Sequence, residues 1–124
     1  MKFTLSHTTE GLDVLREVSE SGRWELGVWR VLYGYRIRAG VVDNGVFAVD
    51  YCTGSDMNHV SEVLGLVRVI LSSLPEDVEG DEVHALMPGF QVKPIHNDKA
   101  CVPRLMALAA RANAGEDLLG REAV

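Results

Sequence analysis

The clearest pattern in the sequence is an alternation of apolar and other residues between positions 29 and 41. Every odd position in this stretch is apolar or aromatic. Because successive side chains of a strand point to opposite faces of a sheet, the pattern predicts one strand with an apolar face and a basic face. The Asp-Asn-Gly sequence at 43–45 predicts a turn into a second strand, and so a β-hairpin. The arginines of the basic face are Arg30, Arg36 and Arg38.

The register of this hairpin is predicted by requiring that the apolar residues of both strands share one face. A three-residue loop at 43–45 meets the requirement, whereas a two-residue loop mixes the two faces and exposes apolar side chains. It also places opposite charges across from each other on the second face, which stabilises a strand pair. The expected pairs are Val41–Phe47, Ala39–Val49 and Ile37–Tyr51 on the apolar face, and Arg38–Asp50 on the other.

An amphipathic helix is predicted over residues 56–74. Ser55 or Asp56 can accept hydrogen bonds from the first free backbone amides, and Pro75 ends the helix. Apolar residues recur at spacings of three and four, and further apolar residues widen the stripe, so we expect this helix to be covered on more than one side. The stripe consists of Met57, Val60, Leu64, Val67, Leu71 and Leu74, widened by Val63, Leu66 and Ile70.

The remaining elements are predicted from weaker patterns. Residues 2–6 alternate as a short strand, and a helix is expected from Thr8 or Thr9 to about residue 21. Residues 24–28 have an ambiguous pattern; one interpretation is that they extend the long strand backwards through a bulge at Gly27, because the apolar positions change from even to odd there. Strand pieces are expected within 83–95, and a last helix from Pro103 to Gly115. The resulting order is β-α-β-β-α-β plus a C-terminal helix, a ferredoxin-like α+β fold with helices on one face of an antiparallel sheet.

Composition and charge are those of one folded domain. The chain has 124 residues, of which 47% are hydrophobic and 24% charged, and we expect a single domain over 1–115 with a frayed tail over 116–124. No apolar run reaches membrane-spanning length and the first residues lack a signal-peptide pattern, so we expect a cytoplasmic protein that does not bind membranes. The net charge of −6 disfavours broad nucleic-acid binding.

Two cysteines and two histidines are the candidates for catalysis or metal binding. Cys52, His59, His96 and Cys101 have the residue types of zinc ligands, but their spacing matches no standard zinc motif, and the plainer interpretation is reduced thiols and surface imidazoles. Cys52 could alternatively act as a nucleophile with His59 or His96 as base and Asp98 as its orienting group. No phosphate-binding, dinucleotide or hydrolase motif is present, so no cofactor or metal is expected.

Two charged surfaces are the candidates for partner binding. The basic face with Arg30, Arg36 and Arg38 could contact a protein or RNA, although RNA-binding sheets usually add exposed aromatic residues and here the aromatics lie on the other face. If that face were open instead, Tyr33, Tyr35 and Tyr51 would form a stacking platform. The acidic segment 76–82 is either a solvated linker or a contact for a basic surface. Its carboxylates are Glu76, Asp77, Glu79, Asp81 and Glu82.

The function predicted from these features is a small, non-enzymatic protein-binding or regulatory protein. We expect it to occupy a surface on a larger protein or to form a homodimer through a sheet edge or helix. A small acidic inhibitor carried by a mobile element or phage and directed at a host complex fits this description. The alternatives are a cysteine- or zinc-dependent enzyme centred on Cys52, His59 and His96, and an RNA-binding module that uses the arginine face.

Overall fold

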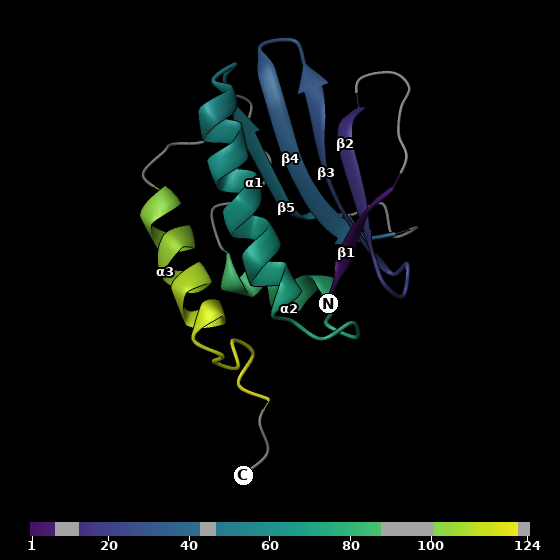
Figure 1. The fold of residues 1–124 in the computed structure, drawn as a ribbon, viewed down its shortest axis with the longest axis vertical. Coiled ribbons are helices and arrows are strands. Elements are labelled where there is room, and N and C mark those ends of the chain that lie inside the picture. Colours follow the sequence, from purple (N-terminus) through teal and green to yellow (C-terminus); the bar gives the residue numbers. More distant parts are fainter. Residues whose placement is uncertain (7–12, 43–46, 88–100, 122–124) are drawn as a thin grey trace.

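The structure, a computed structural model, describes residues 1–6, 13–42, 47–87 and 101–121. Among these residues a five-stranded antiparallel sheet is followed by three helices, which confirms the α+β class (Figure 1). The strands lie in the sheet in their sequence order, so each pairs with its chain neighbours. The elements are β1 Phe3–Ser6, β2 Asp13–Ser19, β3 Trp24–Val31, β4 Gly34–Val41, β5 Phe47–Thr53, α1 Met57–Ser72, α2 Gly80–Leu86 and α3 Val102–Asn113.

The ferredoxin-like order is not found, because two predicted elements differ. Residues 13–19 of the predicted first helix form strand β2, which pairs with β1 and β3. The spacing Leu12, Leu15, Val18 suits a helix, but two intervals of three residues are a weak signal, and pairing on both sides outweighs it. Residues 83–86 of the predicted last strand lie in α2. Met87 is the C-cap of that helix, and the rest of the prediction, residues 88–95, falls outside the described residues.

The predicted long strand over 29–41 is two strands joined by a turn at Leu32 and Tyr33. β3 ends at Val31, which pairs with Gly34 at the start of β4. A two-residue loop pairs even positions with odd ones, so Leu26 lies opposite Ala39 and shares its face. The change from even to odd apolar positions therefore has its origin in this turn, and the predicted bulge at Gly27 is wrong, because the β3–β4 register runs through Gly27 without a shift.

The β4–β5 hairpin has the predicted register over most of its length. The pairs Ile37–Tyr51, Arg38–Asp50 and Ala39–Val49 are all confirmed. The Val41–Phe47 pair is wrong, because a register shift after Ala39 places Phe47 opposite Gly40, on the second face of the sheet. The predicted loop itself lies in 43–46, outside the described residues.

Helix α1 lies along one face of the sheet, and α3 lies beside α1 and packs against it (Figure 1). The side chain of Asp56 caps α1 by accepting hydrogen bonds from the amides of Asn58 and His59, as predicted. The apolar face of the sheet and the stripe of α1 form the core between them, and the position of α3 explains why α1 is apolar on two sides. Fully buried core side chains include Trp24, Leu26, Ile37, Val49, Tyr51, Val63, Val67, Ile70 and Leu71.

The last helix begins and ends as predicted. Pro103 lies in its first turn, and Gly115 follows its end with a φ of 80°, a conformation that favours glycine. Beyond it, the side chain of Leu118 is buried, and Arg121 forms ion pairs with Asp77 and Glu82. These contacts hold the chain up to residue 121 against the domain.

Within the described part of the chain, no helix is both long and apolar enough to cross a membrane.

Candidate interaction surfaces

The three arginines predicted to share a face lie on two different faces of the sheet. Arg30 pairs with Tyr35, on the face that carries Ile37 and is covered by α1. Arg36 pairs with Trp29, on the second face. The two-residue turn between the strands causes this difference, because it pairs even positions of β3 with odd positions of β4. Even positions of β3 and even positions of β4 therefore lie on opposite faces of the sheet. The prediction of one arginine face formed by these residues is therefore wrong.

Arg36 and Arg38 are both engaged by Asp50. Arg36 donates two hydrogen bonds to the carboxylate, Nε to Oδ1 at 3.0 Å and Nη2 to Oδ2 at 2.6 Å. The Nε of Arg38 lies 3.5 Å from Oδ2 of the same carboxylate. Asp50 is only 1% exposed, and its hydrogen bonds raise the pKa of Arg36 above its ordinary value. Two cations therefore surround one buried anion, which stabilises the hairpin; Arg36 is hydrogen-bonded to it, whereas the buried Nε of Arg38 is an ion-pair partner without a hydrogen bond among the described residues.

The guanidinium of Arg38 also stacks on two aromatic rings of the second face. Its Cζ lies 4.6 Å from the ring centroid of Phe47 and 5.6 Å from that of Trp29, and the two rings meet edge to face at 6.1 Å. Cation–π contacts at these distances stabilise the folded chain by about 0.5–1 kcal/mol each when exposed. The register shift after Ala39 makes this contact, because it moves Phe47 onto the face of Trp29. The prediction that Trp29 and Phe47 lie on the apolar face is therefore wrong for both residues.

Most carboxylates of the acidic segment 76–82 bind groups within the chain. Glu76 accepts hydrogen bonds from the hydroxyls of Ser19 and Ser21 and from the Ser21 amide, which joins the segment to the turn between β2 and β3. Glu79 and Glu82 form a capping box at the start of α2. In the same segment, the main-chain oxygen of Val78 accepts bonds from Arg23 and from the Trp24 indole at 3.2 Å. The segment is therefore a structural clamp rather than a solvated linker.

The hydrogen bonds of the clamp favour the charged form of its carboxyl groups. Burial raises the pKa of Glu76, but the bonds from Ser21 and Ser19 outweigh it and lower that pKa below the ordinary value. The pKa of Glu82 is lowered first by the Glu79 amide and then by Arg121. Asp81 differs from both, because it is exposed and has no hydrogen bond or ion pair among the described residues.

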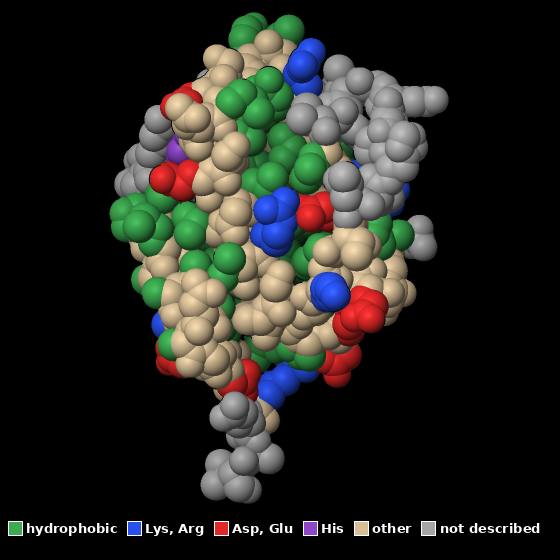
Figure 2. Space-filling model, viewed as in Figure 1, with side chains coloured by type: hydrophobic (Ala, Val, Ile, Leu, Met, Phe, Trp, Pro, Cys, Tyr) green, Lys and Arg blue, Asp and Glu red, His purple; other side chains and the backbone are tan. Residues whose placement is uncertain are grey.

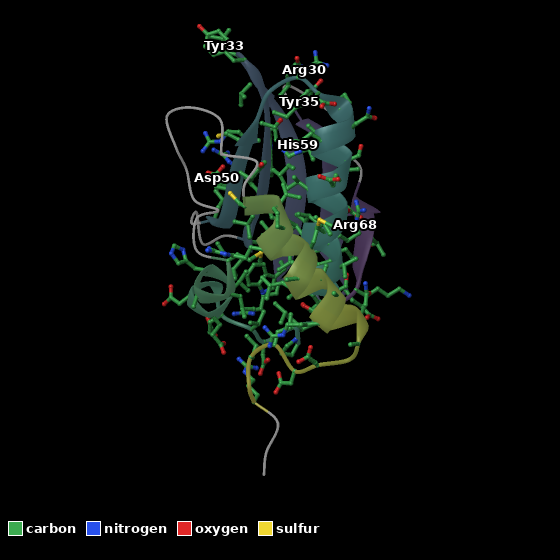
Figure 3. The ribbon with its side chains drawn as sticks, turned by 90° about the vertical axis from the view of Figure 1, so that its left-hand side faces the viewer. Arg30, Tyr33, Tyr35, Asp50, His59 and Arg68 are labelled. Carbon is green, nitrogen blue, oxygen red and sulfur yellow. The ribbon has the colours of Figure 1, made fainter. Side chains whose placement is uncertain are left out.

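The turn between β3 and β4 presents the most exposed apolar side chains of the described residues. Leu32 is 84% exposed and Tyr33 77% exposed. Figure 3 shows Tyr33 projecting beyond the end of the sheet, with Arg30 and Tyr35 at its base. Figure 2 shows hydrophobic atoms at the same upper end of the molecule. We call Arg30, Leu32 and Tyr33 the hairpin end; a shallow depression beside it is lined by these residues together with Tyr35 and Ser55.

A second hollow lies at the opposite end of the same strands. It measures about 290 Å³, and its lining combines apolar residues of the strands with two carboxylates and an imidazole on or next to α2. We call it the acidic hollow; it is lined by Val41, Phe47 and Ala48 from the strands and by Glu79, Gly80, Asp81 and His84.

The proposed catalytic pair of Cys52 and His59 is not assembled. Cys52 pairs with Arg36 and belongs to the second face of the sheet. His59 lies in the first turn of α1, on the covered face of the sheet, where its Nε2 is 2.9 Å from the hydroxyl of Tyr51. The sheet therefore separates the two side chains. His96 and Asp98 fall outside the described residues.

The described residues also contain no cluster of three or more side chains placed to bind a metal ion. Cys52 and Cys101 are not joined by a disulfide. The stacking platform considered for RNA is absent as well, because the side chain of Tyr51 is fully buried.

Comparisons of the chain with protein-family models, with curated proteins and with solved structures found no match.

Proposed function

We propose that this chain is a non-enzymatic protein-binding domain whose contact surface is the hairpin end. The observation that carries the proposal is the exposure of Leu32 and Tyr33 side by side at the tip of a hairpin whose strands are fixed in the sheet. Large exposed apolar side chains grouped at one place are typical of interaction sites, whereas single ones are not. A regulatory or inhibitory role on a larger complex is consistent with such a surface.

The chemistry of the hairpin end suits a protein partner. Tyr and Arg are enriched among the residues that contribute most to protein–protein affinity, because each combines a large contact area with hydrogen-bonding groups. Arg30 is exposed and has no ion-pair partner among the described residues. We therefore expect the partner to offer a concave apolar site with a carboxylate at its rim. The net charge of −6 makes an anionic membrane a poor alternative.

Most of the other contact residues predicted from the sequence already bind groups within the chain, which favours the hairpin end as the contact surface. Arg36 donates two hydrogen bonds to the buried carboxylate of Asp50, and a partner that used it would first have to break them. Glu76 and Glu82 accept hydrogen bonds within the chain. The ion pairs of Asp77 and Glu79 are exposed and worth little, so they hold these carboxylates only weakly. Of the predicted contact residues, Arg30 and Asp81 are the two that form no ion pair within the described part of the chain.

A double substitution at the turn tests the proposal. In affinity capture from the native host, the variant Leu32→Ser/Tyr33→Ser should lose at least one protein that co-purifies with the wild type. The expected affinity loss is 100-fold or more, on the order of 3 kcal/mol, since truncating one central contact residue costs about 2 kcal/mol. Met106→Ser is the matched control, because Met106 is an apolar side chain 54% exposed on α3.

Two results would count against the proposal. One is the same set of co-purifying proteins with the wild type, the double variant and the control. The other is binding of the wild type to phosphatidylserine vesicles that the double variant lacks, which would assign the hairpin end to a membrane surface. Circular dichroism and urea unfolding of each variant establish that the fold is retained.

A further inference from the structure

The two ends of the central strands carry complementary features. The hairpin end lies where β3 turns into β4, and the acidic hollow lies where β4 ends and β5 begins, beside α2. Figure 1 shows these two places at opposite ends of the sheet, with the β3–β4 turn at the top and α2 at the bottom. One end projects and the other is hollowed, so the shapes of the two ends are opposite.

The charges of the two ends are opposite as well. Arg30 is an exposed cation without an ion-pair partner among the described residues. Asp81, which lines the acidic hollow, is an exposed anion that likewise has no ion-pair partner among them. Glu79 adds a second carboxylate, 68% exposed although it lies 3.2 Å from Arg23. Because the chain carries a net charge of −6, contacts between two copies are in general repulsive. A contact between these two ends brings opposite charges together, so the electrostatic interaction there is attractive.

The size of the hollow points to side chains as its occupant. Its volume of about 290 Å³ lies just below the range of about 300–1,000 Å³ for pockets that hold drug-sized ligands. The half-buried side chains of Val41 and Phe47 in its lining offer apolar surface to an aromatic or aliphatic side chain. Leu32 and Tyr33 are side chains of that kind. Among the described residues, no other two adjacent residues are both large, apolar and exposed.

We propose that the chain self-associates head to tail, with the hairpin end of one copy seated in the acidic hollow of the next. This inference rests on the proposed function and names a second copy of the chain as a partner. Two different surfaces meet in such a contact, so it is heterologous, and repetition gives an open chain or a closed ring rather than a two-fold dimer. A contact limited to one turn and one small hollow is at the weak end of protein interfaces, with a Kd in the micromolar to millimolar range.

The test uses two variants that each lose one end. Leu32→Ser/Tyr33→Ser removes the projecting side chains. Gly80→Leu/Asp81→Lys adds a large side chain to one lining residue of the hollow and reverses the charge of another. A Cβ built on Gly80 meets no atom within 4 Å, so the position has room for a side chain. Urea unfolding of both variants should remain within about 0.5 kcal/mol of the wild type, as for other exposed substitutions.

Sedimentation equilibrium between about 10 μM and about 1 mM then gives the masses, over the range in which weak association is populated. The average mass of the wild type should rise with concentration beyond that of two protomers of 13.6 kDa each. Each variant alone should stay at one protomer. The average mass of an equimolar mixture of the two variants should rise to that of two protomers and no further. In this mixture the intact hairpin end of one variant can bind the intact hollow of the other, and no further contact can form. This complementation is the signature of a heterologous contact.

Three results would overturn the inference. They are a wild type that stays at one protomer at every concentration, a wild type that stops at two protomers, and a mixture that stays at one protomer while the wild type associates. A monomeric wild type whose hairpin-end variant still loses a captured protein contradicts self-association alone and leaves the proposed function standing.

Discussion

Replacing Asp50 by Asn should lower the free energy of unfolding by about 3 kcal/mol, because removing one partner of a buried ion pair leaves the other charge uncompensated. Asp50 is 1% exposed and lies between the guanidinium groups of Arg36 and Arg38, whose side chains are 21% and 25% exposed. Without the carboxylate, two half-buried cations repel each other across neighbouring positions of β4. Urea unfolding followed by circular dichroism measures the change.

The matched control for this substitution is Asp81→Asn, which removes a carboxylate that is exposed and unpaired among the described residues. Exposed substitutions of this kind change the free energy of unfolding by no more than about 0.5 kcal/mol. A cost for Asp50→Asn within about 1 kcal/mol of the control would show that the Arg36–Asp50–Arg38 cluster does not stabilise the hairpin.

Gly34→Ala should be the second strongly destabilising substitution, with a cost of at least about 2 kcal/mol, as expected where an added group forces the backbone to move. A Cβ on Gly34 would lie 2.0 Å from the carbonyl oxygen of Thr53 and 2.8 Å from the carbonyl group of Gly54. These are backbone atoms that cannot rotate away as the end of a side chain can. The start of β4 must therefore separate from the end of β5, which also displaces the hairpin end.

Gly65→Ala is the control, with the opposite sign expected. Gly65 lies within α1, and a Cβ there meets no atom within 4 Å. Alanine should stabilise the helix by about 0.5–1 kcal/mol because glycine has the greater freedom to lose on folding. If Gly34→Ala unfolds at the same urea concentration as the wild type, the close approach of β4 to Thr53 is not present in solution.

Local patterns in the sequence were sufficient to predict the β4–β5 hairpin and α1. The pairing of Ile37 with Tyr51 follows from alternation on both sides of a glycine-containing turn, and α1 follows from its stripe and the Asp56 cap. Both elements are organised by contacts between residues close in the chain. The α+β class depends on these elements alone, which is why it could be predicted.

The hairpin end was missed because its turn lacks the usual turn residues. Leu32 and Tyr33 are apolar or aromatic, and odd apolar positions continue through the turn from Val31 to Tyr35, as if in one strand. The signal that could have revealed the turn is the change of apolar positions from Leu26 and Val28 to Ile37 and Ala39. A two-residue turn explains that change as well as a bulge does, and only strand pairing distinguishes them.

The roles of the charged residues could not be predicted for a different reason. Which carboxylate meets which arginine depends on contacts between residues far apart in the chain, such as Arg68 with Glu17 and Arg121 with Asp77. Figure 3 shows Arg68 and Asp50 on opposite sides of the sheet, each in its own cluster. A sequence gives the number of charges, but the register and the helix positions decide which of them stay unpaired.

The measurement that tests the central claim most directly is photo-crosslinking from the hairpin end. With p-benzoylphenylalanine in place of Tyr33, irradiation in the native host should give discrete adducts of higher mass, including one of two protomers if the chain self-associates. The same group in place of Met106 should not give them, although that side chain is 54% exposed. Absence of adducts from position 33, or the same adducts from both positions, would contradict the assignment of the hairpin end as the binding surface.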